Sequence, residues 1–247
     1  MNAVGATEQT GRGGPALSET FSGFPEEGVE FLLELKRNNN RQWFEANRES
    51  FDTFLMQPAR SLVVSLGDRL REIAPRVTAD PRTNKSIFRI FRDTRFSKDK
   101  SPYKTHLGLF CWEGARPKME CPGFYFHLEP PELLLGVGLY MFPKDLIDPY
   151  RASVVDPKHG EQLLRALDPI LSEKDYALGG KHYKRVPSGY DKDHPSAEYL
   201  LYNGLFGGYT VPIPRAIHTS DLPDFCMEHY RRMLPLHRWL VDLAERA

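Results

Sequence analysis

LGLFCWEGARPKMECPGFYFHLEPPELLLGVGLYMF, residues 107–142, decides the fold of this chain. Large apolar residues alternate with smaller or polar residues over 107–112 and 124–129, and a long apolar run follows over 133–142. A period of two is typical of β-strands, and segments with glycine and proline separate the three runs. The stretch therefore predicts a three-stranded antiparallel meander.

Two glycines interrupt the third run. Gly136 and Gly138 fall on the same strand face as Tyr140. Glycine inside a strand costs stability and marks a place where another backbone or a ligand comes close. For these two positions we favour close packing of a helix over a ligand groove.

The segments on either side of this stretch have helical periodicity. Apolar residues recur at helical spacing over 24–35, 43–55, 62–73 and 163–171, and again from Leu222 to the end of the chain. Proline, acidic residues and asparagine stand where helices begin and end. We therefore predict helices before the meander and after it.

The order of helices, sheet and helices predicts a single α+β domain over residues 21–247. Its antiparallel β-sheet, of about four to six strands, is covered by the N-terminal and C-terminal helices. One of the additional strands is predicted over 209–213, at a sheet edge because of its prolines. Residues 1–20 are small and polar, and we expect them to form a disordered N-terminal tail.

Composition restricts the function classes. The 247 residues hold 33 Lys and Arg against 33 Asp and Glu, so the formal net charge is zero. No apolar run approaches the roughly twenty residues of a bilayer span, and no signal peptide is visible, so we expect a soluble cytoplasmic protein without a membrane partner.

The cysteines and histidines give no recognisable metal motif. The three cysteines form no Cys-x-x-Cys pair, which argues against a disulfide framework and a structural zinc site. A looser set can be drawn from His106, Cys111, Cys121 and His127, but its spacing matches no zinc motif. We predict no metal site, and the sequence identifies no cofactor.

The candidate site is the basic segment, residues 82–106, with eight Lys or Arg against two acids. Such a local run in a neutral chain suggests a localised anion site. Periodicity favours a helix at its start and composition favours a strand, so both remain open. We expect Asp93 to be an internal counter-ion that orients Arg89, Arg92 or Arg95.

A second polar stretch, residues 181–194, contains Lys184 and His194. The leading hypothesis is an anion-binding protein or enzyme whose small-molecule ligand carries a phosphate or carboxylate. Lys184 would close over the anion, and His194 or Asp93 would act as acid or base. The proposed clamp consists of Arg92, Arg95, Lys100 and Lys104.

Three segments carry a resemblance to a known family: Phe21-Ser-Gly-Phe24 with residues 31–44, residues 89–104 and residues 184–195. In these segments the chain resembles the conserved hypothetical family called domain of unknown function 2461, which has no established activity. The resemblance covers nearly everything after the tail. It implies that the polar residues of these motifs are the positions to test, namely Arg41, Trp43, Arg89, Arg92, Asp93, Arg95, Lys100, Tyr103, Lys104, Lys184 and His194.

Two alternative functions remain open. The first is a nucleic-acid or protein interaction module, in which Phe96, Tyr103 and Trp112 supply stacking surfaces beside the cations. Because the whole chain has no net charge, we favour a small anion over nucleic acid as the partner. The second is structural: the arginines and Asp93 form an ion-pair network and the function lies elsewhere. The sequence specifies neither a reaction nor an oligomeric state.

Overall fold

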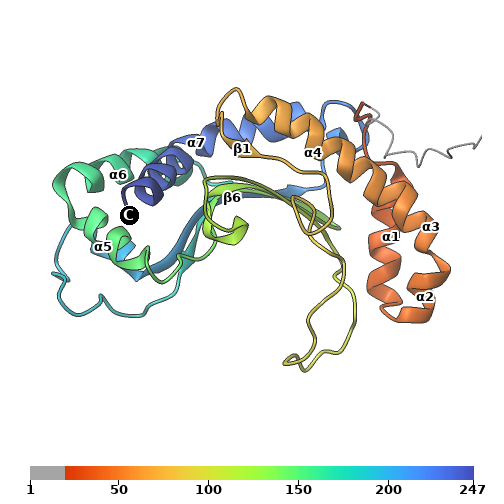
Figure 1. Ribbon diagram of the computed structural model, residues 1–247, viewed down its shortest axis with the longest axis horizontal. Helices are drawn as coiled ribbons and strands as arrows, with labels where there is room; N and C mark the ends of the chain where they lie inside the picture. Colours follow the sequence, from red (N-terminus) through yellow and green to blue (C-terminus); the bar gives the residue numbers. More distant parts are fainter. Residues whose placement is uncertain (1–19) are drawn as a thin grey trace, which may run out of the picture.

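A six-stranded antiparallel sheet forms the centre of the computed structural model, which describes residues 20–247 (Figure 1). The strand order is β1-β2-β3-β4-β6-β5. The predicted meander is confirmed, because β2 pairs with β3 and β3 with β4 in sequence order. The strands are β1 (Val77–Thr78), β2 (Leu107–Glu113), β3 (Gly123–Glu129), β4 (Glu132–Leu139), β5 (Tyr176–Lys181) and β6 (Tyr202–Pro212).

Helices with clear local signals precede the sheet. Two acids in the first turn and two bases in the last turn complement the dipole of α1. The Asn40 side chain caps α2 by accepting a hydrogen bond from the Trp43 N–H at 3.0 Å. The helices here are α1 (Glu26–Arg37), α2 (Arg41–Ala46), α3 (Arg48–Ser50), the π-helical η1 (Phe51–Met56) and α4 (Gln57–Leu70).

Further helices follow the meander. Asp156 caps α6 by accepting hydrogen bonds from two backbone N–H groups, and Pro157 occupies the first turn. The longest helix runs through Pro235 and buries one face along most of its length. The elements are α5 (Ile147–Val155), α6 (Pro157–Leu171) and α7 (Leu222–Arg246), with short 3₁₀ turns at η2 (Lys118–Glu120), η3 (Ala197–Leu201) and η4 (Arg215–His218).

The helices cover one face of the sheet. Figure 1 shows α4 and α7 lying across its upper side, with α1 at one end and α5 at the other. Leu133, Leu135 and Val137 of β4 point to this covered side and are buried, each leucine contributing roughly 1.5–3 kcal/mol. The predicted α+β single domain, with N-terminal and C-terminal helices on an antiparallel sheet, is therefore confirmed.

Some elements differ from the prediction. The strand expected over 209–213 begins at Tyr202, and it lies between β4 and β5 and not at an edge of the sheet as expected. The elements β1, β5 and α5 were not predicted. Short or glycine-containing elements such as these carry too little periodicity to be recognised. The tail predicted over 1–20 falls on residues that, apart from Thr20, lie outside the described part. Within residues 20–247, no helix combines the length and apolar character needed to cross a membrane.

Candidate functional site

The sheet face opposite α4 and α7 carries a cavity of about 450 Å³, which we call the open-face cavity. This volume lies within the range of small-molecule sites. The floor is formed by strand residues and one wall by Phe88 of the basic segment. Most of the lining is apolar and aromatic, with contributions from Phe110, Leu134, Tyr140 and Phe206.

Glycines create the space above the floor. A Cβ added to Gly136 would meet no atom closer than 3.5 Å, and one added to Gly208 none closer than 3.9 Å. The expectation that a helix packs against Gly136 and Gly138 is wrong. The helices cover the opposite face of β4, where Leu135 and Val137 point, whereas both glycines line the cavity.

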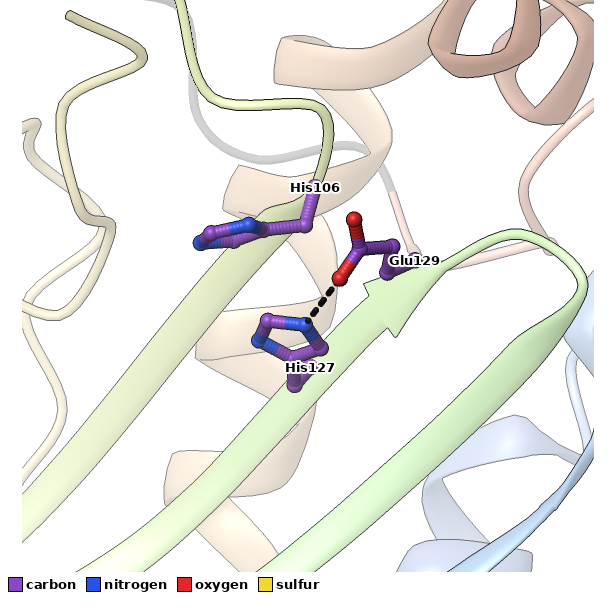
Figure 2. A group of neighbouring side chains, drawn as sticks. All are labelled: His106, His127 and Glu129. Carbon is purple, nitrogen blue, oxygen red and sulfur yellow. Dashed lines mark hydrogen bonds and ion pairs between the residues drawn. The ribbon is translucent and has the colours of Figure 1, made fainter. Parts of the chain in front are cut away.

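One end of the cavity is polar. His127 and Glu129 are alternate residues of β3 and share a face, and the pairing of Leu107 with Leu128 places His106 across from Glu129. Figure 2 shows the three side chains on the same side of the strands, with the Glu129 carboxylate directed at His127. The two imidazole ring centres lie 4.2 Å apart.

Hydrogen bonds hold this polar end in place. The Tyr125 hydroxyl lies 2.8 Å from His127 Nδ1, and His127 Nε2 lies 3.3 Å from Glu129 Oε2. Thr105 Oγ1 donates to the other oxygen of Glu129 at 2.9 Å. The result is a continuous hydrogen-bonded chain from Thr105 to Tyr125, which can orient His127 and relay a proton.

Burial sets the protonation of these groups. Burial, with the neighbouring His127 imidazole, lowers the pKa of His106 to about 4, so His106 is neutral at pH 7. Burial raises the pKa of Tyr125 to about 12. Burial also opposes the charge of Glu129, but hydrogen bonds from Thr105 and His127 outweigh it and leave the pKa of Glu129 below 4.5.

Two lysines reach the ring of Phe88, Lys104 from an irregular part of the basic segment and Lys118 from η2. Lys104 Nζ lies 5.4 Å and Lys118 Nζ 4.2 Å from the ring centre. Burial lowers the pKa of both amines, and Arg89 lowers that of Lys104 further. Within residues 20–247, neither lysine has a carboxylate partner, although Lys118 donates to the Lys85 carbonyl at 2.7 Å.

The start of the basic segment is neither helix nor strand. It is an irregular chain joined to β2 by an isolated bridge between Ile87 and Leu109. As expected, Asp93 is an internal counter-ion: its carboxylate binds Arg95 at 2.7 Å. Arg92 pairs with Asp99 and also donates to a backbone carbonyl at 3.2 Å.

The other predicted ligand residues of this region have different surroundings. Lys100 donates to the Thr94 carbonyl at 2.9 Å, and Tyr103 is only 2% exposed, with its ring stacked on Phe44. Trp43 packs against Phe31, while Arg41 is exposed on α2.

Lys184 and His194 lie far from the basic segment. Figure 1 shows residues 182–196 below α5, whereas residues 90–100 form a separate loop below the sheet, on the side toward α1. Lys184 is exposed, and His194 Nδ1 accepts a hydrogen bond from the Ser196 N–H at 3.0 Å. The structure therefore does not bring the two predicted halves of the site into one pocket.

Four residues at the cavity or beside it had no predicted role in the sequence, namely Thr105, Lys118, Tyr125 and Glu129. The alternation Tyr125-x-His127-x-Glu129 was a usable signal, since it places three polar groups on one strand face. The looser metal set is not assembled, because Cys111 points to the helix-covered face, whereas Cys121 lines the cavity.

Replacing Arg92 by alanine is expected to shift the melting temperature by less than about 2 °C, because its ion pair with Asp99 is partly exposed. Thermal denaturation followed by circular dichroism measures this shift. A drop of more than about 8 °C would instead assign Arg92 to the scaffold.

One family model matches the chain. It is described as conserved hypothetical protein (DUF2461) and matches residues 27–239. The family suggested by the sequence motifs is confirmed. No curated protein matches this chain.

Proposed function

The chain belongs to the conserved hypothetical protein family DUF2461, and we propose that it binds a small molecule in the open-face cavity. The ligand combines an apolar body with a phosphate or carboxylate group. The observation that carries this proposal is the apolar cavity with two partly buried lysines, Lys104 and Lys118, beside its Phe88 wall.

The cavity lining favours an apolar body. Phe110, Leu134 and Phe206 present hydrocarbon or ring surface, and Gly136 leaves room above the strand. Burying apolar ligand surface here contributes roughly 25 cal/mol per Å².

The two lysines favour an anionic group. Their lowered pKa values mean that the fold opposes their positive charge, chiefly through burial. A phosphate or carboxylate between the amines would supply the missing counter-charge and hydrogen-bond acceptors. Arg89, near enough to lower the pKa of Lys104, adds to the positive potential.

The remaining predicted residues take other roles in this proposal. Arg92 and Arg95 shape the basic segment through their aspartate partners. Asp93 and His194 do not line the cavity, so their proposed acid or base roles would require another site or a rearrangement.

Octanoate and octyl phosphate serve as probes, with octanol as the uncharged reference. We expect calorimetry to show binding of at least one of the two anions, with octanol at least about tenfold weaker. Lys104→Met and Lys118→Met should each lower the affinity for the anion about tenfold, equivalent to about 1.4 kcal/mol. Their affinity for octanol should change little.

Two further variants test the location. Gly136→Val places methyl groups in the cavity at a position with room for a Cβ, and should block binding of the anions and octanol while the protein stays folded. Lys158→Met, on the helix-covered side, is the charge-matched control and should bind like wild type. Unchanged binding by Gly136→Val would refute the cavity, and equal affinity for octanol and both anions would refute the anion site.

A further inference from the structure

We propose that His106, His127 and Glu129 form a binding site for a divalent transition-metal cation at the polar end of the open-face cavity. The proposed metal binding depends only on the geometry of these three residues. Only its role in holding the ligand's anionic group rests on the proposed function. This departs from the expectation, drawn from motif spacing, that the chain has no metal site.

The donor atoms are close enough to share one ion. One donor atom from each residue lies within 4.8 Å of the others, and His127 Nε2 lies 3.3 Å from Glu129 Oε2. Metal–ligand bonds of about 2.0–2.2 Å place donors about 3.0–3.5 Å apart. The His127–Glu129 pair therefore has the required spacing already, and a small side-chain rotation brings in His106.

The hydrogen bonds from Tyr125 and Thr105 engage the atoms of His127 and Glu129 that would not bind the metal. Tyr125 engages His127 Nδ1, so that Nε2 faces Glu129. Thr105 donates to Oε1 of Glu129, so that Oε2 faces His127. In known metal sites, such outer hydrogen bonds fix the orientation of the ligands and tune their affinity.

The donor set indicates the class of metal. Two imidazoles and one carboxylate suit Zn²⁺, Fe²⁺, Mn²⁺ or Co²⁺ better than Mg²⁺ or Ca²⁺, which prefer oxygen alone. Three protein ligands leave at least one coordination position open. Because His106 and His127 both line the cavity, we infer that the open position faces the bound molecule.

Charge favours an anion as the remaining ligand. Glu129 supplies the single negative charge of the three residues, and Lys104 is near enough to influence His106. A divalent cation beside Lys104 would have excess positive charge, which a phosphate or carboxylate would offset. The metal and the two lysines would thus bind the same group.

The test uses the full chain after chelation and removal of the chelator. Zn²⁺, Mn²⁺ and Co²⁺ are titrated by calorimetry, and Co²⁺ binding is also followed by visible absorption. We expect one equivalent of at least one metal to bind and to raise the melting temperature. His127→Ala and Glu129→Gln should each lower the affinity roughly 100-fold or more, and Thr105→Val about 10- to 100-fold.

The controls separate this site from adventitious binding. His159 also lies beside a carboxylate, with its Nδ1 2.8 Å from Asp156 Oδ1, so His159→Ala should bind metal like wild type. Glu129→Gln preserves side-chain size and guards against misfolding as the cause of lost affinity. No stoichiometric binding by wild type, or binding that survives in both His127→Ala and Glu129→Gln, would overturn the proposal.

The two proposals can fail separately. Metal binding is measured without octanoate or octyl phosphate, and binding of these probes is repeated on the chelated protein. Metal binding without probe binding would support the metal site and refute the proposed ligand. Probe binding to protein that takes up no metal would do the reverse.

Discussion

Replacing Glu113 by alanine is expected to lower the free energy of unfolding by about 3–5 kcal/mol. Glu113 ends β2 and is only 5% exposed. Its carboxylate accepts a hydrogen bond from His237 Nε2 at 2.8 Å and another from the Arg76 N–H at 3.2 Å. Alanine would leave both donors buried or half-buried without a partner, at the junction of α7 and the sheet.

The cost should depend on the partner left behind. His237 Nδ1 is already buried without a hydrogen bond in the described part of the chain, so His237 without Glu113 would be wholly unpaired. The double variant Glu113→Leu with His237→Leu should therefore be more stable than Glu113→Leu alone. Urea denaturation of wild type, Glu113→Leu and the double variant measures their free energies of unfolding. A single variant as stable as the double variant would contradict this account.

Acidification should reduce the contribution of Glu113. The hydrogen bond from His237 is the main reason that the pKa of Glu113 lies below 4.5 in the folded protein. A lowered pKa stabilises the fold at pH values above about 4.5, and the effect is lost as the pH falls through the folded pKa. The stability difference between wild type and Glu113→Gln should be constant above about pH 6 and shrink below about pH 4.5. A difference that grows on acidification would disagree with this sign.

Replacing Gly138 by alanine is expected to cost about 3 kcal/mol or more. Gly138 has a φ of +145°, a region that residues with a side chain rarely adopt. Its added Cβ would lie 2.3 Å from the Leu205 carbonyl oxygen and 2.5 Å from Phe206 Cα. Both contacts involve the β6 backbone, so relief would require the central strands to separate.

Gly136→Ala is the matched control, two residues earlier on the same strand face. It has room for a Cβ and no left-handed φ, so its unfolding free energy should be within about 1 kcal/mol of wild type. Chemical denaturation of the two variants under identical conditions measures the contrast. Equal costs at the two positions would show that lost strand flexibility, and not backbone geometry, explains the effect.

Much of the fold was predictable because its signals are local. Alternation over 107–142 predicted the meander, and Asn40 and Asp156 cap helices as their side chains suggest. β5 escaped detection because two of its six residues are glycine and its sequence has no clear alternation.

The candidate site was only partly predictable. The basic segment does supply Lys104 and Phe88 to the neighbourhood of the cavity. Its conformation could not be predicted, because the bridge between Ile87 and Leu109 of β2 holds an irregular chain that has no periodicity of its own. Lys184 and His194 resembled a second half of the site in composition, but their segment, residues 182–196, lies below α5, apart from the loop of residues 90–100.

The sequence by itself determined the meander, most of the helices and the direction of side chains within each strand of the meander. Tyr125, His127 and Glu129 must share a face, because side-chain direction in a strand alternates with every residue. Tertiary structure decided which face the helices cover and that His106, just before β2, lies across from Glu129. Those outcomes depend on packing between segments far apart in the chain, where buried surface, and not local periodicity, selects the arrangement.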